Sequence, residues 1–176
     1  MRGNVNTRLA KLDAGEYDAI ILACAGLIRL DMADRIRAEL SAVDSLPAVG
    51  QGAVGIECRN DNAPLIALLQ CLTCPETTVR VMAERAMNAK LQGGCQVPIG
   101  SYATLTPDAS GNIILHLSGL VANVDGTQLL ESDANVILEQ DAATQVQQAI
   151  SLGQQIAQQL LDQGAGEILA AVELGQ

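Results

Sequence analysis

Cys95 is the residue whose surroundings best suit covalent chemistry. It lies in the run Leu91-Gln-Gly-Gly-Cys-Gln-Val-Pro-Ile-Gly100, where two glycines precede the thiol and a proline follows it. A thiol on a Gly-rich loop beyond a helix is accessible, as a covalent attachment site requires. The alternative is a structural role, because most isolated cysteines are small buried hydrophobes.

Cys71 and Cys74 have the spacing of a redox pair or of half a zinc site. There is no second pair of this kind and His116 is the only histidine, so a four-ligand zinc site lacks partners and we predict no metal site. A thioredoxin-like pair begins a helix after a strand, whereas this pair is expected at the end of a helix before Pro75. We interpret both as incidental thiols and keep a thiol-redox protein as an alternative hypothesis.

Basic side chains near the N-terminus indicate an anionic ligand. Arg2, Arg8 and Lys11 form one patch, and Arg29 follows a predicted buried strand. Ligand sites in open α/β sheets lie at the carboxyl ends of strands, where Arg29 is expected. Guanidinium groups bind carboxylates through paired donors, which favours a polycarboxylate ligand. The alternative is a solvated helix face.

The charge distribution argues against polyanionic partners. The net charge is −10, and all ten Lys and Arg lie between Arg2 and Lys90. Residues 91–176 carry nine Asp and Glu and no cation, which would repel nucleic-acid phosphates and anionic lipid headgroups. Two Tyr and no Trp or Phe leave no stacking surface for single-stranded nucleic acid. We expect no nucleic-acid or membrane binding. Because no signal peptide precedes the five cysteines, we expect reduced thiols and a cytoplasmic location.

The elements of the first 72 residues predict an incomplete α/β unit. We expect a helix from Val5 capped by Asn4, strands over residues 17–24 and 54–58, and helices over residues 31–40 and 63–72. The strands would place Cys24 and Cys58 in the core. The Gly-rich run from Gly50 to Gly55 precedes a strand instead of following one, so we interpret it as a connection and not as a phosphate loop. Two strands are too few for an open sheet, as if the sequence began inside a domain.

The remaining residues predict a small α+β domain. We expect a helix from Thr77 or Thr78 to about Leu91, three strands over residues 99–106, 112–121 and 128–136, and a long helix over residues 141–161. Gly93 and Gly94 are expected to end the first helix, and Gly164 and Gly166 the second. His116 is predicted on the polar face of its strand.

Three segments of the chain resemble the hydroxymethylbilane synthase (porphobilinogen deaminase) family. Arg2-Gly-Asn-Val-Asn-Thr-Arg-Leu-Ala-Lys-Leu-Asp13 resembles its RGNVxTRLxKLD segment. Leu46-Pro-Ala-Val-Gly-Gln-Gly-Ala53, with Gly55 and Glu57, resembles its LPAxGQGAxGIE segment. Glu84-Arg-Ala-Met-Asn88, then Leu91 and Gly93-Gly-Cys-Gln-Val-Pro-Ile-Gly100, resembles its ERAxxxxLxGGCxxPIG cofactor segment.

The resemblance implies a chemistry in which porphobilinogen units and growing pyrrole oligomers are the substrates. The family joins four porphobilinogen molecules into hydroxymethylbilane, releases ammonia at each step, and builds the chain on a dipyrromethane primer held by a thioether. Cys95 matches the cysteine that bears this covalent cofactor. Arg2, Arg8 and Arg29 match arginines that bind acetate and propionate groups of cofactor and substrate. Gln51 and Gly52 match the inter-domain hinge segment and are expected to line the substrate cleft.

The resemblance also implies that an N-terminal part of the enzyme is missing, and with it the family's catalytic aspartate. We therefore expect no catalytic residue in this chain, no activity of the chain alone, and the missing N-terminal half as a partner. The expected fold combines the remnant of a periplasmic-binding-protein-like α/β domain (residues 1–52, hinge included), a segment that packs in the missing first domain (53–72), and a cofactor-bearing α+β domain (73–176). Full-length members are expected to be monomeric. The alternative is a non-catalytic interaction module that self-associates through its exposed surface.

Overall fold

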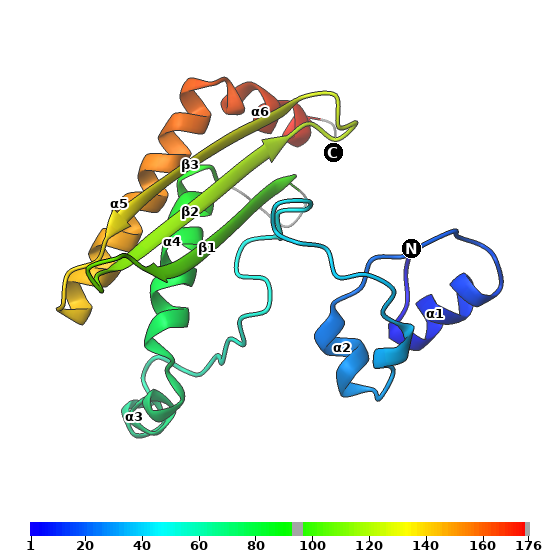
Figure 1. The fold of residues 1–176 in the computed structure, drawn as a ribbon, viewed down its shortest axis with the longest axis horizontal. Coiled ribbons are helices and arrows are strands. Elements are labelled where there is room, and N and C mark those ends of the chain that lie inside the picture. Colours follow the sequence, from blue (N-terminus) through cyan, green and yellow to red (C-terminus); the bar gives the residue numbers. More distant parts are fainter. Residues whose placement is uncertain (93–96, 175–176) are drawn as a thin grey trace. The chain divides into compact units, whose positions relative to one another are not determined.

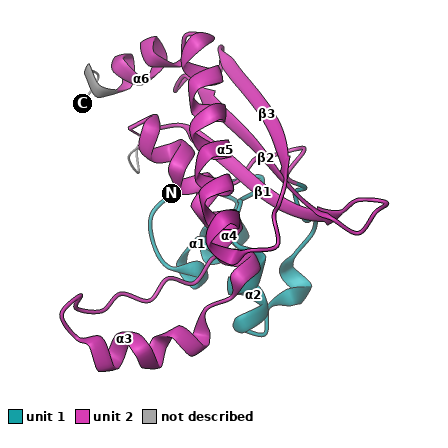
Figure 2. Cartoon of the chain, turned by 90° about the vertical axis from the view of Figure 1, so that its left-hand side faces the viewer, with its two compact units in different colours: residues 1–41 teal, residues 42–176 magenta. Residues whose placement is uncertain are grey.

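The structure, a computed structural model, describes residues 1–92 and 97–174, in two compact units, Met1–Ser41 and Ala42–Gln176 (Figure 2). The elements in chain order are α1 (Val5–Asp13), α2 (Cys24–Arg29), the 3-10 helix η1 (Ala33–Arg35), α3 (Ala63–Leu69), the 3-10 helix η2 (Gln70–Leu72), α4 (Pro75–Lys90), β1 (Ile99–Pro107), β2 (Ile113–Ala122), β3 (Leu129–Ile137), α5 (Ala142–Asp162) and α6 (Ala165–Leu174).

The first unit is small and helical. Asn4 accepts a hydrogen bond on its side chain from a first-turn backbone N–H at 2.9 Å, so the predicted start of α1 is confirmed. Leu9 on α1 and Leu27 on α2 are the buried apolar side chains of this unit. Arg35 of η1 pairs with Asp13 at 2.5 Å, and this ion pair joins η1 to the end of α1.

Two predictions for the first unit are wrong. Residues 17–23 are irregular and have no ladder partner, and residues 24–29 form α2, where a buried strand over residues 17–24 was expected. Ile21 is 79% exposed, and Cys24 lies half-buried on a helix instead of in a sheet core. Such a strand buries both faces only between neighbouring strands, and no described segment pairs with it. The helix predicted over residues 31–40 is reduced to the single turn η1.

The second unit is built on an antiparallel sheet of order β1-β2-β3, with α4 and α5 packed on one face (Figure 1). Alternate side chains of β2, including Leu115, Leu117 and Val121, are fully buried against these helices. The half-buried His116 lies on the opposite, polar face, where its ring Nε2 is 3.2 Å from Ser118 Oγ. The three predicted strands, the two long helices and the α+β class are confirmed.

Two glycines allow the helices and the sheet to approach closely. A Cβ atom added to Gly153 on α5 would lie 2.1 Å from Ala83 O and 2.9 Å from Met87 N, both on the backbone of α4. A Cβ added to Gly119 on β2 would lie 2.5 Å from Met87 Sδ and 2.7 Å from Ile156 Cγ2. Because neither glycine has a side chain, the fully buried Met87 and Ile156 fill the layer between helices and sheet.

Residues 53–58 form no ladder either, so the strand predicted over residues 54–58 is wrong. Val54 is 91% and Ile56 55% exposed, and Cys58 is exposed instead of lying in a core. The helix predicted over residues 63–72 is confirmed as α3 and η2, and Pro75 starts α4 two residues before the expected threonines. Within the described residues no single helix is long and apolar enough to cross a membrane, although Ala63–Leu72 and Pro75–Lys90 together meet those criteria across a 105° bend.

The sequence did not predict α6. Gly164 has a φ of +105° and follows the end of α5, as expected of a glycine there. Gly166, however, lies inside α6 instead of ending a helix. Ala165 and Ile168 of α6 are buried and belong to the core formed by the sheet, α4 and α5.

Replacing Gly153 with alanine should destabilise the second unit by about 1–3 kcal/mol or more, because the new methyl group meets the backbone of α4, which cannot move aside as a flexible side chain would. Gly166→Ala is the matched control, since a Cβ there meets nothing closer than 3.8 Å. It should stay within about 1 kcal/mol of the unchanged chain. Urea unfolding followed by circular dichroism measures both. Equal midpoints for Gly153→Ala and the unchanged chain would contradict the close contact.

Candidate functional site

Cys95 lies outside the described residues, together with Gly93, Gly94 and Gln96, so the structure defines its surroundings through the two ends of the loop. On one side α4 ends at Lys90 and Leu91 is buried in the core. On the other side β1 begins at Ile99. The loop therefore joins a helix and a strand that pack against each other, and both of its ends are anchored.

The end of α4 differs in detail from the prediction. Gln92 adopts the left-handed conformation with a φ of 56°, so the residue that turns the chain out of the helix precedes the two glycines expected to do so. The Gln92 side chain is exposed. The two glycines themselves lie outside the described residues.

Glu84 belongs to the segment that resembles the family's cofactor motif, but sequence reasoning assigned it no role. Its Oε2 accepts a hydrogen bond from Gly50 N at 2.7 Å and its Oε1 accepts one from Ala103 N at 2.9 Å. Its side chain is only 6% exposed, and burial raises the pKa of the carboxyl above the ordinary 4.5, while the two backbone N–H groups act in the opposite direction. The signal in the sequence is its place beside Ala83 and Met87 on the apolar face of α4.

Gln51 and Gly52 form an exposed turn of the connecting segment, residues 46–52. Gly50 and Gly52 have φ angles of 69° and 87°, and Gln51 N donates to Ala48 O at 3.0 Å. Upstream, Pro47 O accepts from Ser101 N at 2.9 Å. The segment is thus held against β1 at Pro47, and its two predicted substrate-binding residues face solvent.

The three predicted carboxylate-binding arginines all lie in the first unit. Arg8 on α1 is half-buried and its Nε donates to Gly3 O at 2.8 Å, which brings it beside the chain segment that carries Arg2. Arg29 lies in the last turn of α2. Arg2 and Arg29 are exposed, and within residues 1–92 and 97–174 neither has a hydrogen-bond or ion-pair partner. Their guanidinium groups are therefore available to an anionic ligand.

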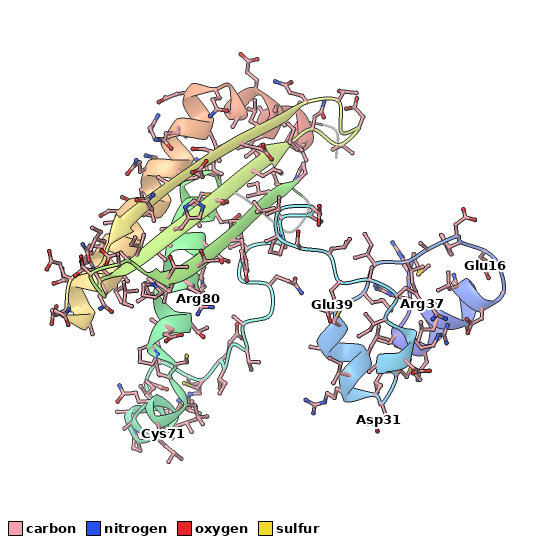
Figure 3. All side chains as sticks on the ribbon, in the orientation of Figure 1. Glu16, Asp31, Arg37, Glu39, Cys71 and Arg80 are labelled. Atoms are coloured by element: carbon pink, nitrogen blue, oxygen red, sulfur yellow. The ribbon has the colours of Figure 1, made fainter. Side chains whose placement is uncertain are left out.

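The thiols of Cys71 and Cys74 occupy different positions around a helix junction. Cys71 is exposed in η2 (Figure 3), whereas Cys74 is the N-cap of α4 and not the end of a helix as predicted. Thr77 Oγ1 donates to Cys74 Sγ at 3.2 Å, and this bond, helped by the Thr77 backbone, lowers the pKa of the thiol. No group of three or more His, Cys, Asp or Glu that could hold a metal ion occurs in the described part of the chain.

An open groove of about 960 Å³ lies beside this junction within the second unit. Its walls come from residues 49–58, from α3 and η2, and from α4 between Thr77 and Asn88. Arg85 is the one charged residue among the described residues that line it, and Cys58 and Cys74 lie on its walls. The groove is otherwise mostly apolar, so it suits contact with protein better than it suits an anionic pyrrole.

Cys74 should react readily with iodoacetamide near neutral pH, because its lowered pKa increases the fraction of thiolate at this site. Thr77→Val removes the hydroxyl donor, so the midpoint of the rate against pH should move upward for Cys74. Thr78→Val is the control, since Thr78 Oγ1 donates to the carbonyl of Cys74 and not to its sulfur. Peptide mass mapping gives the rates, and a midpoint unaffected by Thr77→Val would contradict the assignment.

Two family models match consecutive parts of the chain, and the first includes the connecting segment and most of α3. Residues 1–67 match the model described as porphobilinogen deaminase, dipyromethane cofactor binding domain. Residues 78–162 match the model described as porphobilinogen deaminase, C-terminal domain, and this second match includes α4 from Thr78 onward, the loop after it, the whole sheet and α5. The two matches cover most of the sequence in the order that the enzyme family has them, and they agree with the resemblance seen in its motifs. The chain therefore belongs to the porphobilinogen deaminase family, whose cofactor is dipyrromethane.

Proposed function

We propose that this chain is the cofactor-carrying portion of a hydroxymethylbilane synthase, with dipyrromethane attached through a thioether to Cys95. The observation that supports this most is the match of both family models, because the second includes the loop between α4 and β1. The whole enzyme joins four porphobilinogen molecules head to tail and releases one ammonia at each addition. When bound, dipyrromethane supplies the primer on which the oligomer grows.

The donor set of the chain fits a cofactor and substrate rich in carboxylates. Each pyrrole unit brings an acetate and a propionate group, so a growing oligomer accumulates negative charge that guanidinium groups must neutralise. Arg2 and Arg29 have no described partner, and Arg8 uses only its Nε for Gly3 O, which leaves its terminal nitrogens to bind a carboxylate. We assign these three arginines to cofactor and substrate, and Gln51 and Gly52 to the lining of the substrate cleft.

We further propose that residues 1–52 are part of a periplasmic-binding-protein-like α/β domain with its hinge, that residues 53–72 pack in another domain, and that residues 73–176 form the cofactor-bearing domain. Two irregular stretches support this division, since residues 17–23 and 53–58 have no ladder partner. Strands supplied by an N-terminal half of the enzyme would pair with them and cover the exposed Ile21 and Val54. That half is the proposed partner.

The chain alone is proposed to be inactive. The family's catalytic aspartate has no counterpart among the residues matched by resemblance, so deamination would depend on the N-terminal half. We place the assembled enzyme in the cytoplasm, where the free thiols of Cys24, Cys58, Cys71 and Cys74 would stay reduced.

A second candidate is a non-catalytic interaction module. Exposed apolar side chains of the second unit favour it, notably Val43 at 97%, Val54 at 91%, Leu68 at 68% and Leu72 at 63%. An interaction module should elute from gel filtration as a discrete oligomer and should keep that state when an N-terminal half of a related enzyme is added. Conversion into a one-to-one complex would favour the enzyme portion.

Cys95→Ala should abolish cofactor attachment. After co-expression with the N-terminal half, the intact mass of the unchanged chain should rise by one dipyrromethane, and peptide mapping should place the adduct on Cys95, because a thioether needs this sulfur. Cys74→Ala is the control, since Cys74 is the thiol with the lowered pKa, and it should leave the adduct in place. An adduct that persists in Cys95→Ala would remove Cys95 from its assigned role.

Arg29→Leu should raise the KM for porphobilinogen about tenfold or more in the co-expressed enzyme, because a hydrogen bond to a charged group contributes about 1.5–3 kcal/mol. The fold should be unaffected, since the side chain has no described partner to lose. Arg37→Leu serves as the control, because Arg37 is also exposed in the first unit but carries no assignment (Figure 3). Equal KM values for the Arg29 and Arg37 variants would refute the role given to Arg29.

A further inference from the structure

Glu84 is the one ionisable side chain that is buried among the described residues. Both carboxylate oxygens are engaged, by Gly50 N at 2.7 Å and by Ala103 N at 2.9 Å. These two contacts, called here the carboxylate bridge, join the connecting segment, α4 and β1. A buried carboxylate is costly unless its oxygens accept strong hydrogen bonds, and backbone N–H donors to an ionised acceptor provide them.

The carboxylate bridge lies along the free edge of the sheet. β1 is an edge strand that pairs only with β2. Ser101 and Ala103, two residues apart, each donate a backbone N–H away from the sheet ladder, to Pro47 O at 2.9 Å and to Glu84 Oε1. Just before Ser101 the two chain segments pack closely, because a Cβ on Gly100 would lie 3.3 Å from Leu46 Cβ and from Pro47 O. The connecting segment therefore covers the edge of β1, as edge strands require.

The same bridge fixes both sides of the loop that carries Cys95. Glu84 is on the helix that leads into the loop, and Ala103 is on the strand that leaves it. An apolar residue at position 84 could fill the core, but it would leave the N–H groups of Gly50 and Ala103 without an acceptor. The carboxylate thus links α4 and β1 to the connecting segment through hydrogen bonds at one point. Apolar packing alone would not satisfy these two backbone N–H groups.

We propose that Glu84 is a positioning residue: its carboxylate fastens residues 46–50 to the free edge of β1 and thereby holds α4 and β1, the two elements that flank the Cys95 loop, in a fixed relation to the connecting segment. A role of Glu84 in catalysis rests on the proposed attachment of dipyrromethane to Cys95. The existence of the carboxylate bridge does not depend on that attachment. Arg80, one turn earlier on α4, is the charged group that acts on Glu84. The connecting segment through Gly50 and β1 carry no charged side chain, and α5 carries only Asp162, at its end.

Amide hydrogen exchange of the full chain tests the bridge. Glu84→Gln keeps the size of the side chain but replaces one acceptor oxygen with an NH₂ donor, so exchange at Gly50 or Ala103 should speed up about tenfold or more, while the β2 core amide of Leu117 keeps its rate. Glu76→Gln is the control, because Glu76 is on the same helix but exposed. Unchanged exchange at Gly50 and Ala103, or an equal loss of protection throughout the sheet, would overturn the proposal.

The unchanged chain supplies a second test that needs no variant. On acidification, the Gly50 and Ala103 amide signals should shift together with the Glu84 carboxyl signal in nuclear magnetic resonance spectra, with a midpoint above the ordinary glutamate value. Gly50 and Ala103 amide signals that do not change as Glu84 titrates would overturn the bridge. This test holds even if Glu84→Gln fails to fold.

The consequence for the loop is measured after co-expression with the N-terminal half. Glu84→Gln should load dipyrromethane several-fold more slowly than the unchanged chain, and Glu76→Gln should load at the unchanged rate. Normal loading beside altered exchange would overturn the positioning role. If even the unchanged chain takes up no dipyrromethane, the proposed function fails, while the exchange measurements still decide the bridge.

Discussion

The contact between α4 and α5 at Gly153 is the constraint on which the described part of the second unit depends. Because Gly153 has no side chain, the backbones of α4 and α5 come into contact, and the Met87 side chain is fully buried between the helices and the sheet. This packing sets the position of α4, and hence of Leu91 at its buried end. The loop that carries the candidate attachment thiol therefore leaves a rigid base, as pre-organised chemistry requires.

The sheet and the irregular segments of the chain differ in how their backbone hydrogen-bonding groups are paired. In the sheet, each strand pairs along its length and the free edge of β1 is covered by Pro47 O and the Glu84 carboxylate. Residues 17–23 and 53–58, by contrast, have no ladder partner among the described strands. Unpaired backbone with apolar side chains is a surface that accepts strands from elsewhere, which agrees with the proposed N-terminal partner.

Sequence reasoning predicted the elements that depend on local interactions and failed for those that depend on contacts between distant parts of the chain. The strands after residue 98 and the helix capped by Asp141 were predicted because alternation, turn residues and caps are local signals that match the final packing. The strands expected over residues 17–24 and 54–58 failed because a buried strand depends on neighbours that local sequence does not supply. Glu84 was matched to the family's cofactor segment, but its burial was not predicted, because a glutamate is normally exposed and only its three-dimensional partners justify its burial. The family motifs named Cys95 and the arginines, yet where these residues lie relative to each other depends on contacts beyond local pattern.

The most direct test of the central claim is the consumption of porphobilinogen by the purified chain, first alone and then after co-expression with the N-terminal half of a related enzyme. The account predicts no turnover by the chain alone and ammonia release with hydroxymethylbilane formation by the pair. Turnover by the chain alone at the rate of a complete enzyme would contradict the account, because the catalytic group would then lie within these 176 residues.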